Sequence, residues 1–168
     1  MSDFSLGRTQ PQSKADSPGI VATLHHIDEV RAILHLVIDD LIRRSAVHDA
    51  SKLESPEAEV FEEFTAKLRG TTYGSDEYKA YLAAMKPALD HHYAHNSHHP
   101  EHYANGIRGM SLVDLIEMLC DWLAATKRHE DGDIRRSIEI NQQRFGYGDE
   151  LKAILFNTLP AIEATDRA

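Results

Sequence analysis

Apolar residues in this chain recur every three to four positions, as in α-helices, and no stretch alternates convincingly as a β-strand does. Between residues 20 and 45 this spacing is kept by Ile27, Val30, Leu34, Val37, Ile38 and Leu41. Ser55 and Pro56 predict the start of another helix, because serine caps helices and proline suits the first helical position. Ser75 predicts a cap for a helix over residues 76–95, which Pro87 can divide into two segments.

The second half of the chain continues this pattern. Ser111 opens a predicted helix that ends near residue 129 and has a broad apolar face of Leu112, Leu115, Ile116, Leu119, Trp122 and Leu123. Two more helices are expected over residues 134–144 and 150–159. The first 18 residues are rich in Ser, Gly, Pro and Gln without periodicity, and we expect a flexible arm there. The prediction is an all-α protein, with an arm over residues 1–18 and one domain of five to seven helices over residues 19–168.

Length, net charge and the lengths of the apolar runs exclude several classes of protein. A length of 168 residues suits one domain, and the net charge of -9 makes nucleic-acid binding through phosphates an unfavourable interpretation. A small phosphorylated substrate stays possible, because a bound divalent metal can reverse the local charge. No apolar run approaches the roughly 20 residues of a membrane helix, and no signal peptide is visible. We therefore expect a cytoplasmic protein that does not associate with membranes.

The segment DHHYAHNSHHPEH holds six of the 11 histidines. On the helical wheel His92 falls within the apolar stripe, His95 at its edge, and Asn96 continues the inward line if the helix extends that far. Neutral imidazoles at this spacing can share a metal, but an inward histidine is also an ordinary core residue. The loop pair His98 and His99 cannot be placed by periodicity.

Two further clusters carry candidate chemistry. His26 lies at the border of the first helix's apolar stripe, and His48-Asp49 follows that helix. Asp114, Glu117 and Asp121 share one helical face opposite the apolar one. Taken alone this is a solvated acidic face, but it would supply oxygen ligands for a metal if it fronted the histidine helix.

The order His26, His48-Asp49, histidine-rich helix, Asp121 resembles the H…HD…D signature of the HD-domain metal-dependent phosphohydrolases. The segments VHDASKLESPE, HHYAHNSHHPEH and DLIEMLCDW resemble, more closely, a little-characterised HD-like group from bacteria and phages, over about residues 25–157. The resemblance implies an HD-like helical bundle that holds one divalent metal ion (Mn, Co, Ni, Mg, Fe or Zn). Its ligands would be His26, His48, Asp49 and Asp121.

The resemblance also implies hydrolysis of a nucleotide, a deoxynucleoside mono- or triphosphate, and possible homodimers or larger homo-oligomers. HD nucleotidases often have a Glu shortly after the HD pair, whereas this chain has Lys52 and then Glu54. The candidates for catalysis are Lys52, Glu54, His92 and His95. The candidates for substrate phosphate are Asn96, His99, Arg128 and Arg144, although ion pairing at the surface is the simpler role for both arginines. Histidines of the cluster could instead hold a second metal. The alternatives are an inactive metal- and nucleotide-binding protein and a helical scaffold.

Overall fold

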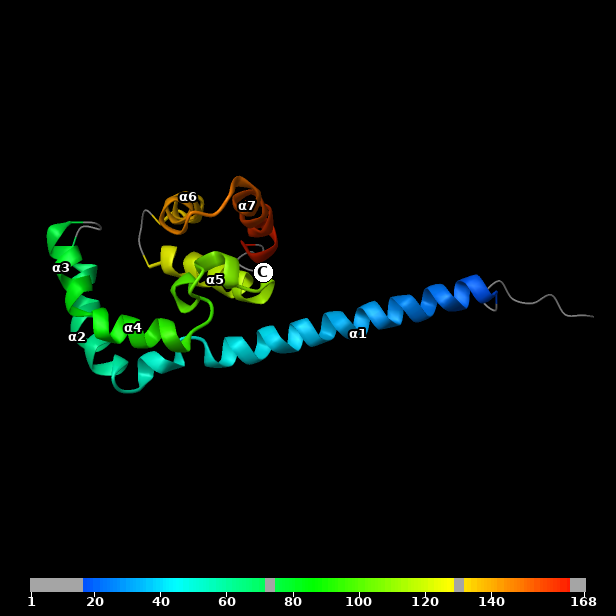
Figure 1. Cartoon of the computed structure of the whole chain (residues 1–168), viewed down its shortest axis with the longest axis horizontal. Helices are drawn as coiled ribbons and strands as arrows, with labels where there is room; N and C mark the ends of the chain where they lie inside the picture. Colours follow the sequence, from blue (N-terminus) through cyan, green and yellow to red (C-terminus); the bar gives the residue numbers. More distant parts are fainter. Residues whose placement is uncertain (1–16, 72–74, 129–131, 164–168) are drawn as a thin grey trace, which may run out of the picture. The chain divides into compact units, whose positions relative to one another are not determined.

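The computed structural model describes residues 17–71, 75–128 and 132–163, where every regular element is helical (Figure 1). The α-helices are α1 (Pro18–Val47), α2 (Glu57–Arg69), α3 (Asp76–Ala84), α4 (Lys86–His95), α5 (Leu112–Thr126), α6 (Ile134–Phe145) and α7 (Asp149–Glu163). Short 3₁₀ helices are η2 (Ala50–Leu53), η3 (Pro100–His102) and η4 (Gly106–Gly109). The all-α prediction is confirmed, with seven α-helices in these ranges. Of the predicted arm, residues 1–16 lie outside the described residues.

Local sequence signals explain most helix boundaries. The helix predicted over residues 76–95 is divided at Met85 into α3 and α4, and Pro87 occupies the first turn of α4, where its missing N–H costs nothing. Ser75 caps α3 by accepting a hydrogen bond from the Tyr78 amide at 3.1 Å. Ser111 caps α5 in a reciprocal capping box with Asp114. Helix α2 begins one residue after the predicted proline, at Glu57.

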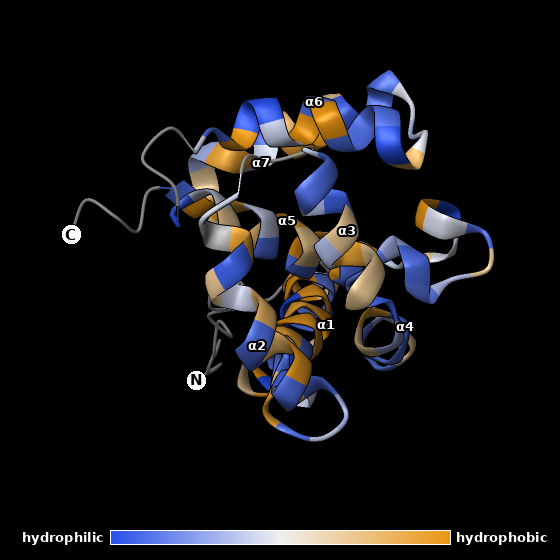
Figure 2. Ribbon diagram, turned by 90° about the vertical axis from the view of Figure 1, so that its left-hand side faces the viewer, coloured by the Kyte–Doolittle hydropathy of each residue, from blue (hydrophilic) through white to orange (hydrophobic). Residues whose placement is uncertain are grey.

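The chain divides into two compact units, residues 1–40 and 41–168. Within the first unit the described residues belong almost entirely to α1, a helix without any buried residue. Its large apolar side chains are exposed, and Figure 2, which looks along this helix, shows many of its turns in the hydrophobic colour. They include Ile20, Leu24, Ile27, Leu34, Val37 and Ile38. No helix in the described part of the chain is both long and apolar enough to cross a membrane.

The second unit has its core among α5, α6 and α7. Ile138 and Leu159 are fully buried there, and Leu119 is 1% exposed. Burying each such side chain contributes roughly 1.5–3 kcal/mol. Helices α2, α3 and α4 pack against one another, and both α2 and α4 contact η2 (Figure 1). This packing brings the turn after α1 beside the histidine-rich helix, and so builds the site described next.

Candidate metal centre

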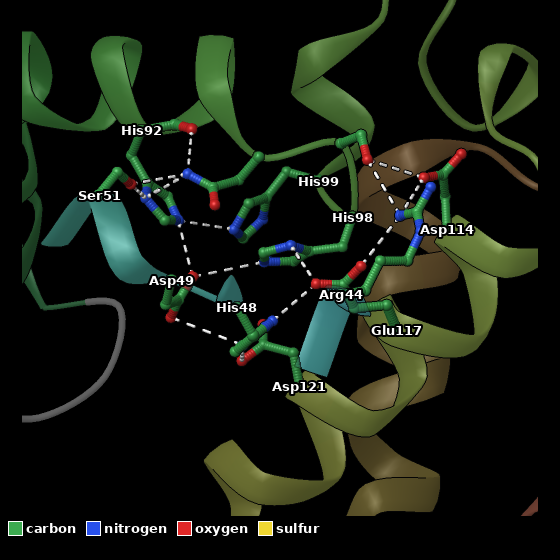
Figure 3. A network of polar contacts seen from close by, with 12 residues as sticks. Arg44, His48, Asp49, Ser51, His92, His98, His99, Asp114, Glu117 and Asp121 are labelled. Atoms are coloured by element: carbon green, nitrogen blue, oxygen red, sulfur yellow. Dashed lines mark hydrogen bonds and ion pairs between the residues drawn. The ribbon is translucent and has the colours of Figure 1, made fainter. Parts of the chain in front are cut away.

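His48 and Asp49 form the turn that joins α1 to η2. Asp49 adopts a left-handed backbone conformation, with φ of 57°, which costs a non-glycine residue about 1–2 kcal/mol. Aspartate tolerates this conformation better than most residues, and such strain gathers at functional sites. The turn directs both side chains of the pair toward α4 and α5, as Figure 3 shows.

His92 carries the α4 contribution to the site and is 1% exposed, as its place on the helical wheel predicted. Its Nε2 atom lies 3.3 Å from Asp49 Oδ1 and 2.9 Å from His99 Nε2. His98 is also buried, and its Nε2 atom lies 3.5 Å from the same carboxylate oxygen of Asp49. Three imidazoles from one segment of sequence therefore face Asp49.

Glu57 stands behind His92 and is fully buried. Its Oε2 lies 2.9 Å from His92 Nδ1 and accepts a hydrogen bond from Ser51 Oγ at 3.0 Å, and its Oε1 lies 2.7 Å from His91 Nδ1. A carboxylate can only accept, so His92 carries a proton on Nδ1 and turns Nε2 toward Asp49. Such an outer carboxylate fixes the orientation of a ligand histidine in metal proteins.

Glu117, on α5, does the same for two other histidines. Its Oε1 lies 2.8 Å from His48 Nδ1 and 3.2 Å from His98 Nδ1, which leaves both Nε2 atoms facing inward. Its Oε2 accepts a hydrogen bond from Arg44 at 3.0 Å, and Arg44 also donates to Asp114 Oδ1 at 2.8 Å. Asp114 is buried and accepts further bonds from Ser97, Tyr103 and Ser111. Hydrogen bonds therefore connect Glu117, through Arg44 and Asp114, to the capping residue Ser111 of α5.

Two of the inner atoms of this cluster are left without a hydrogen-bond partner. They are Asp49 Oδ1 and His98 Nε2, and both are buried. Acceptors this close repel one another unless a proton or a cation lies between them, and an unpartnered buried polar atom costs about 1–3 kcal/mol. Atoms within 4.8 Å of one another form three candidate ligand sets: Asp49, His92, His98 and His99; His48, Asp49 and Asp121; and His48, His98 and Glu117. Asp49 belongs to the first two, so these residues fit one cation or two adjacent ones.

The carboxylates make the cluster a negatively charged site, in which a bound metal would have to displace the proton of His48. Contact with Asp121 raises the pKa of His48 to about 9, against the effect of burial and with further help from Glu117. Burial acts to raise the pKa of Asp49, but the His92 ring and the Lys52 ammonium outweigh it and hold that pKa well below its usual range. Burial, reinforced by His98 and His92, lowers the pKa of His99 to about 3, so its ring is neutral at pH 7. The site thus combines ionised carboxylates with an imidazole lone pair.

The predicted metal ligands fall into two parts of the chain. His48, Asp49 and Asp121 come together in one candidate set, although Asp49 and Asp121 are 72 positions apart. His26 has an exposed side chain on α1 in the first unit, and the candidate sets of the described residues do not contain it. The role of His26 as a ligand therefore stays a prediction.

The other predicted site residues differ in their surroundings. Lys52 Nζ lies 2.6 Å from Asp49 Oδ2, and the Asn96 amide donates to Ser51 Oγ beside His92. His95 is exposed and stacks on His91, with ring centroids 4.1 Å apart. Glu54 and Arg128 are exposed.

Arg144 pairs with Glu101 at 2.6 Å, which is the surface ion pairing considered as its simpler role.

Sequence reasoning missed part of the site. The acidic face of α5, expected to be solvated, is turned inward: Asp114 is 3% exposed, and Glu117 and Asp121 contact His48. The alternative given in the sequence analysis, that the acidic face lies against histidine side chains, agrees with the structure. The only available signal was the Asp114 position three residues after Ser111, which is that of a capping box.

Over the described residues the fold is all-helical, and the site is a histidine–carboxylate cluster that could hold a metal ion. A family model matches residues 18–163, nearly the whole described chain, and the protein belongs to that family, the family of unknown function DUF5662. No curated protein and no solved structure matches the chain.

Proposed function

We propose that this protein is a divalent-metal-dependent phosphohydrolase acting on a nucleotide. The observation that carries the proposal is the convergence of Asp49 Oδ1 with the Nε2 atoms of His92, His98 and His99, two of these four atoms lacking any partner. A helical scaffold needs no such arrangement, since buried polar groups in structural cores are normally paired. The resemblance of the chain to HD-domain phosphohydrolases supports the same activity.

A divalent cation would polarise the phosphoryl group and make water a stronger nucleophile at neutral pH. The chain's own residues supply the rest. Glu57 and Glu117 hold the imidazoles with Nε2 inward, so that little reorganisation is needed on binding. Lys52 neutralises Asp49 in the structure described, and its flexible ammonium can turn to a substrate phosphate once a cation replaces it.

The reaction is the hydrolysis of a phosphate ester. The oxygen of water forms a bond to phosphorus, the ester P–O bond breaks, and the leaving oxygen takes up a proton, giving an alcohol and phosphate. The ammonium of Lys52 is the candidate for contact with the phosphate during this step. His99 is neutral at pH 7, and its low pKa makes it a weak base, so its lone pair suits a metal ligand better than a proton acceptor.

The test is hydrolysis of a nucleotide panel by purified protein loaded with Mn²⁺, Co²⁺, Ni²⁺ or Mg²⁺, with metal content measured alongside. We expect turnover in the wild type and a loss of at least 100-fold in Asp49→Ala and Asp121→Ala. Turnover that survives both substitutions would disprove the assignment. Stoichiometric metal with tight nucleotide binding but no turnover would identify an inactive binding protein instead. Purified protein without bound metal would favour the helical scaffold.

We also propose that α1 pairs with α1 of a second copy. Its exposed residues Ile20, Leu24, Ile27, Leu34 and Ile38 follow the alternating four- and three-residue spacing of coiled-coil helices, with Arg31 at the one polar position. A pair of identical helices can bury such stripes against each other with two-fold symmetry. Light scattering should give a dimer mass for the wild type and a monomer mass for Leu34→Asp. A monomeric wild type would refute the pairing.

A further inference from the structure

An open cavity of about 440 Å³ adjoins the candidate metal centre, between the last turns of α1 and the middle of α5. His48 and Asp121, which belong to a candidate ligand set, line one part of it. Leu41, Ile116, Cys120 and Ala124 are among the residues that line the rest. The volume lies in the range of about 300–1,000 Å³ typical of small-molecule sites.

The cavity's two kinds of lining follow from helical geometry. Ile116, Cys120 and Ala124 recur every four residues and form one row along α5, whereas Glu117 and Asp121 form the next row around the helix. The row of ligand and positioning carboxylates therefore runs directly beside an apolar row. A molecule that placed a charged group at the metal centre would have its remaining part against apolar side chains.

The charge of the cavity lining argues against a second phosphate in the same place. Arg44 and the protonated His48 are the cations among the lining residues, and carboxylates already pair with both. Asp114 and Glu117 hold the Arg44 guanidinium at 2.8 and 3.0 Å, and Glu117 lies 2.8 Å from His48 Nδ1. Glu117 and Asp121 add negative charge at the same wall. A chain of further phosphates would meet carboxylates and apolar carbon there, both of which disfavour an anion.

We propose that this cavity binds the organic part of the substrate, and that the substrate is a phosphate monoester whose organic group is uncharged and largely apolar, such as an aromatic ring. This inference rests on the proposed phosphohydrolase function, and it selects nucleoside monophosphates over triphosphates. The phosphate would bind at a cation held by His48, Asp49 and Asp121, and the organic group would lie between the end of α1 and α5. Hydrolysis breaks the same ester P–O bond and releases the organic group as an alcohol.

The experiment compares monoesters that differ only in the organic group: 1-naphthyl, phenyl and glycerol 2-phosphate, together with thymidine mono- and triphosphate. Ala124→Phe fills the cavity from an exposed position that is in no ligand set, and Ala83→Phe on exposed α3 is the matched control. We expect Ala124→Phe to lower kcat/KM for the naphthyl ester at least roughly tenfold, mainly through KM, and to change the value for glycerol 2-phosphate little. Ala83→Phe should leave kcat/KM for all of the esters unchanged.

A binding measurement tests the cavity independently of hydrolysis. It uses metal-loaded protein and two unreactive analogues, 1-naphthylphosphonate and methylphosphonate. If no ester is hydrolysed, the phosphohydrolase proposal fails, yet tighter binding of the naphthyl compound that is lost only in Ala124→Phe would still support the cavity's role. Equal turnover of all esters and no effect of Ala124→Phe would overturn the inference while leaving the function standing. A change of oligomeric state in Ala124→Phe alone would show that a protein surface fills the cavity, and would also overturn it.

Discussion

Replacing Asp49 by Asn should abolish the stabilisation of the protein by metal and change the stability of the metal-free protein only slightly. Asp49 Oδ1 faces His92 Nε2 at 3.3 Å and His98 Nε2 at 3.5 Å without a hydrogen bond. An amide N–H in the same place can donate to an imidazole nitrogen, and asparagine also tolerates the left-handed backbone at this position. The substitution is nearly isosteric, so packing changes little.

The magnitude follows from opposing effects. Relief of an unsatisfied buried acceptor is worth about 1–3 kcal/mol. Loss of the partly exposed Lys52–Asp49 ion pair costs roughly 1 kcal/mol or less. The lowered pKa of Asp49 shows that its ionised form also interacts favourably with His92, and this attraction is lost in the amide. These effects largely cancel, so the metal-free Tm should stay within about 4 °C of the wild type. Metal at 100 times its Kd should stabilise the wild type by about 2.7 kcal/mol, and Asp49→Asn not at all.

Thermal unfolding with chelator and with Mn²⁺ measures both effects on the same samples. Asp90→Asn, which removes an exposed ion pair with Lys86, is the matched control and should leave both Tm values within about 2 °C of the wild type. The reasoning is refuted if Asp49→Asn keeps the metal-dependent shift.

Three further predictions address other parts of the molecule. Glu57→Gln should weaken metal binding about 10–100-fold in calorimetric titrations, because Glu57 fixes the His92 ring; unchanged affinity would contradict that role. Asp114→Ala should lower the free energy of unfolding by about 3 kcal/mol in urea, since it removes the Asp114 half of the α5 capping box and one of the two carboxylates that hold Arg44. Glu63→Ala, at an exposed pair with Lys67, should cost less than about 1 kcal/mol, and equal losses would mean that the Asp114 network adds nothing. Burial raises the pKa of Tyr147 to about 12 from the usual 10, so its contribution is complete below pH 10 and is lost as the pH rises through 12. Tyr147→Phe should remove up to about 2 kcal/mol of that alkaline destabilisation, and an unchanged pH profile would show that Tyr147 does not cause it.

Much of the helical architecture was readable from the sequence, because helix formation depends on neighbours three and four residues away. The caps at Ser75 and Ser111, the division near Pro87 and the inward position of His92 all follow from local spacing. The loop after α4 was different: without periodicity nothing in the sequence could place His98, which is buried beside Asp49.

The helical wheel gives the face on which a side chain lies, but not what that face meets. The carboxylates of α5 formed an acidic stripe that would be solvated on an isolated helix. Tertiary packing sets Glu117 against His48, 69 positions earlier, and Glu57 against His92, 35 positions later. The sequence by itself thus determined the helices and the residue types able to bind a metal. Only the tertiary structure decided which carboxylates orient the histidines and which atoms converge, because those contacts join segments that no local rule connects.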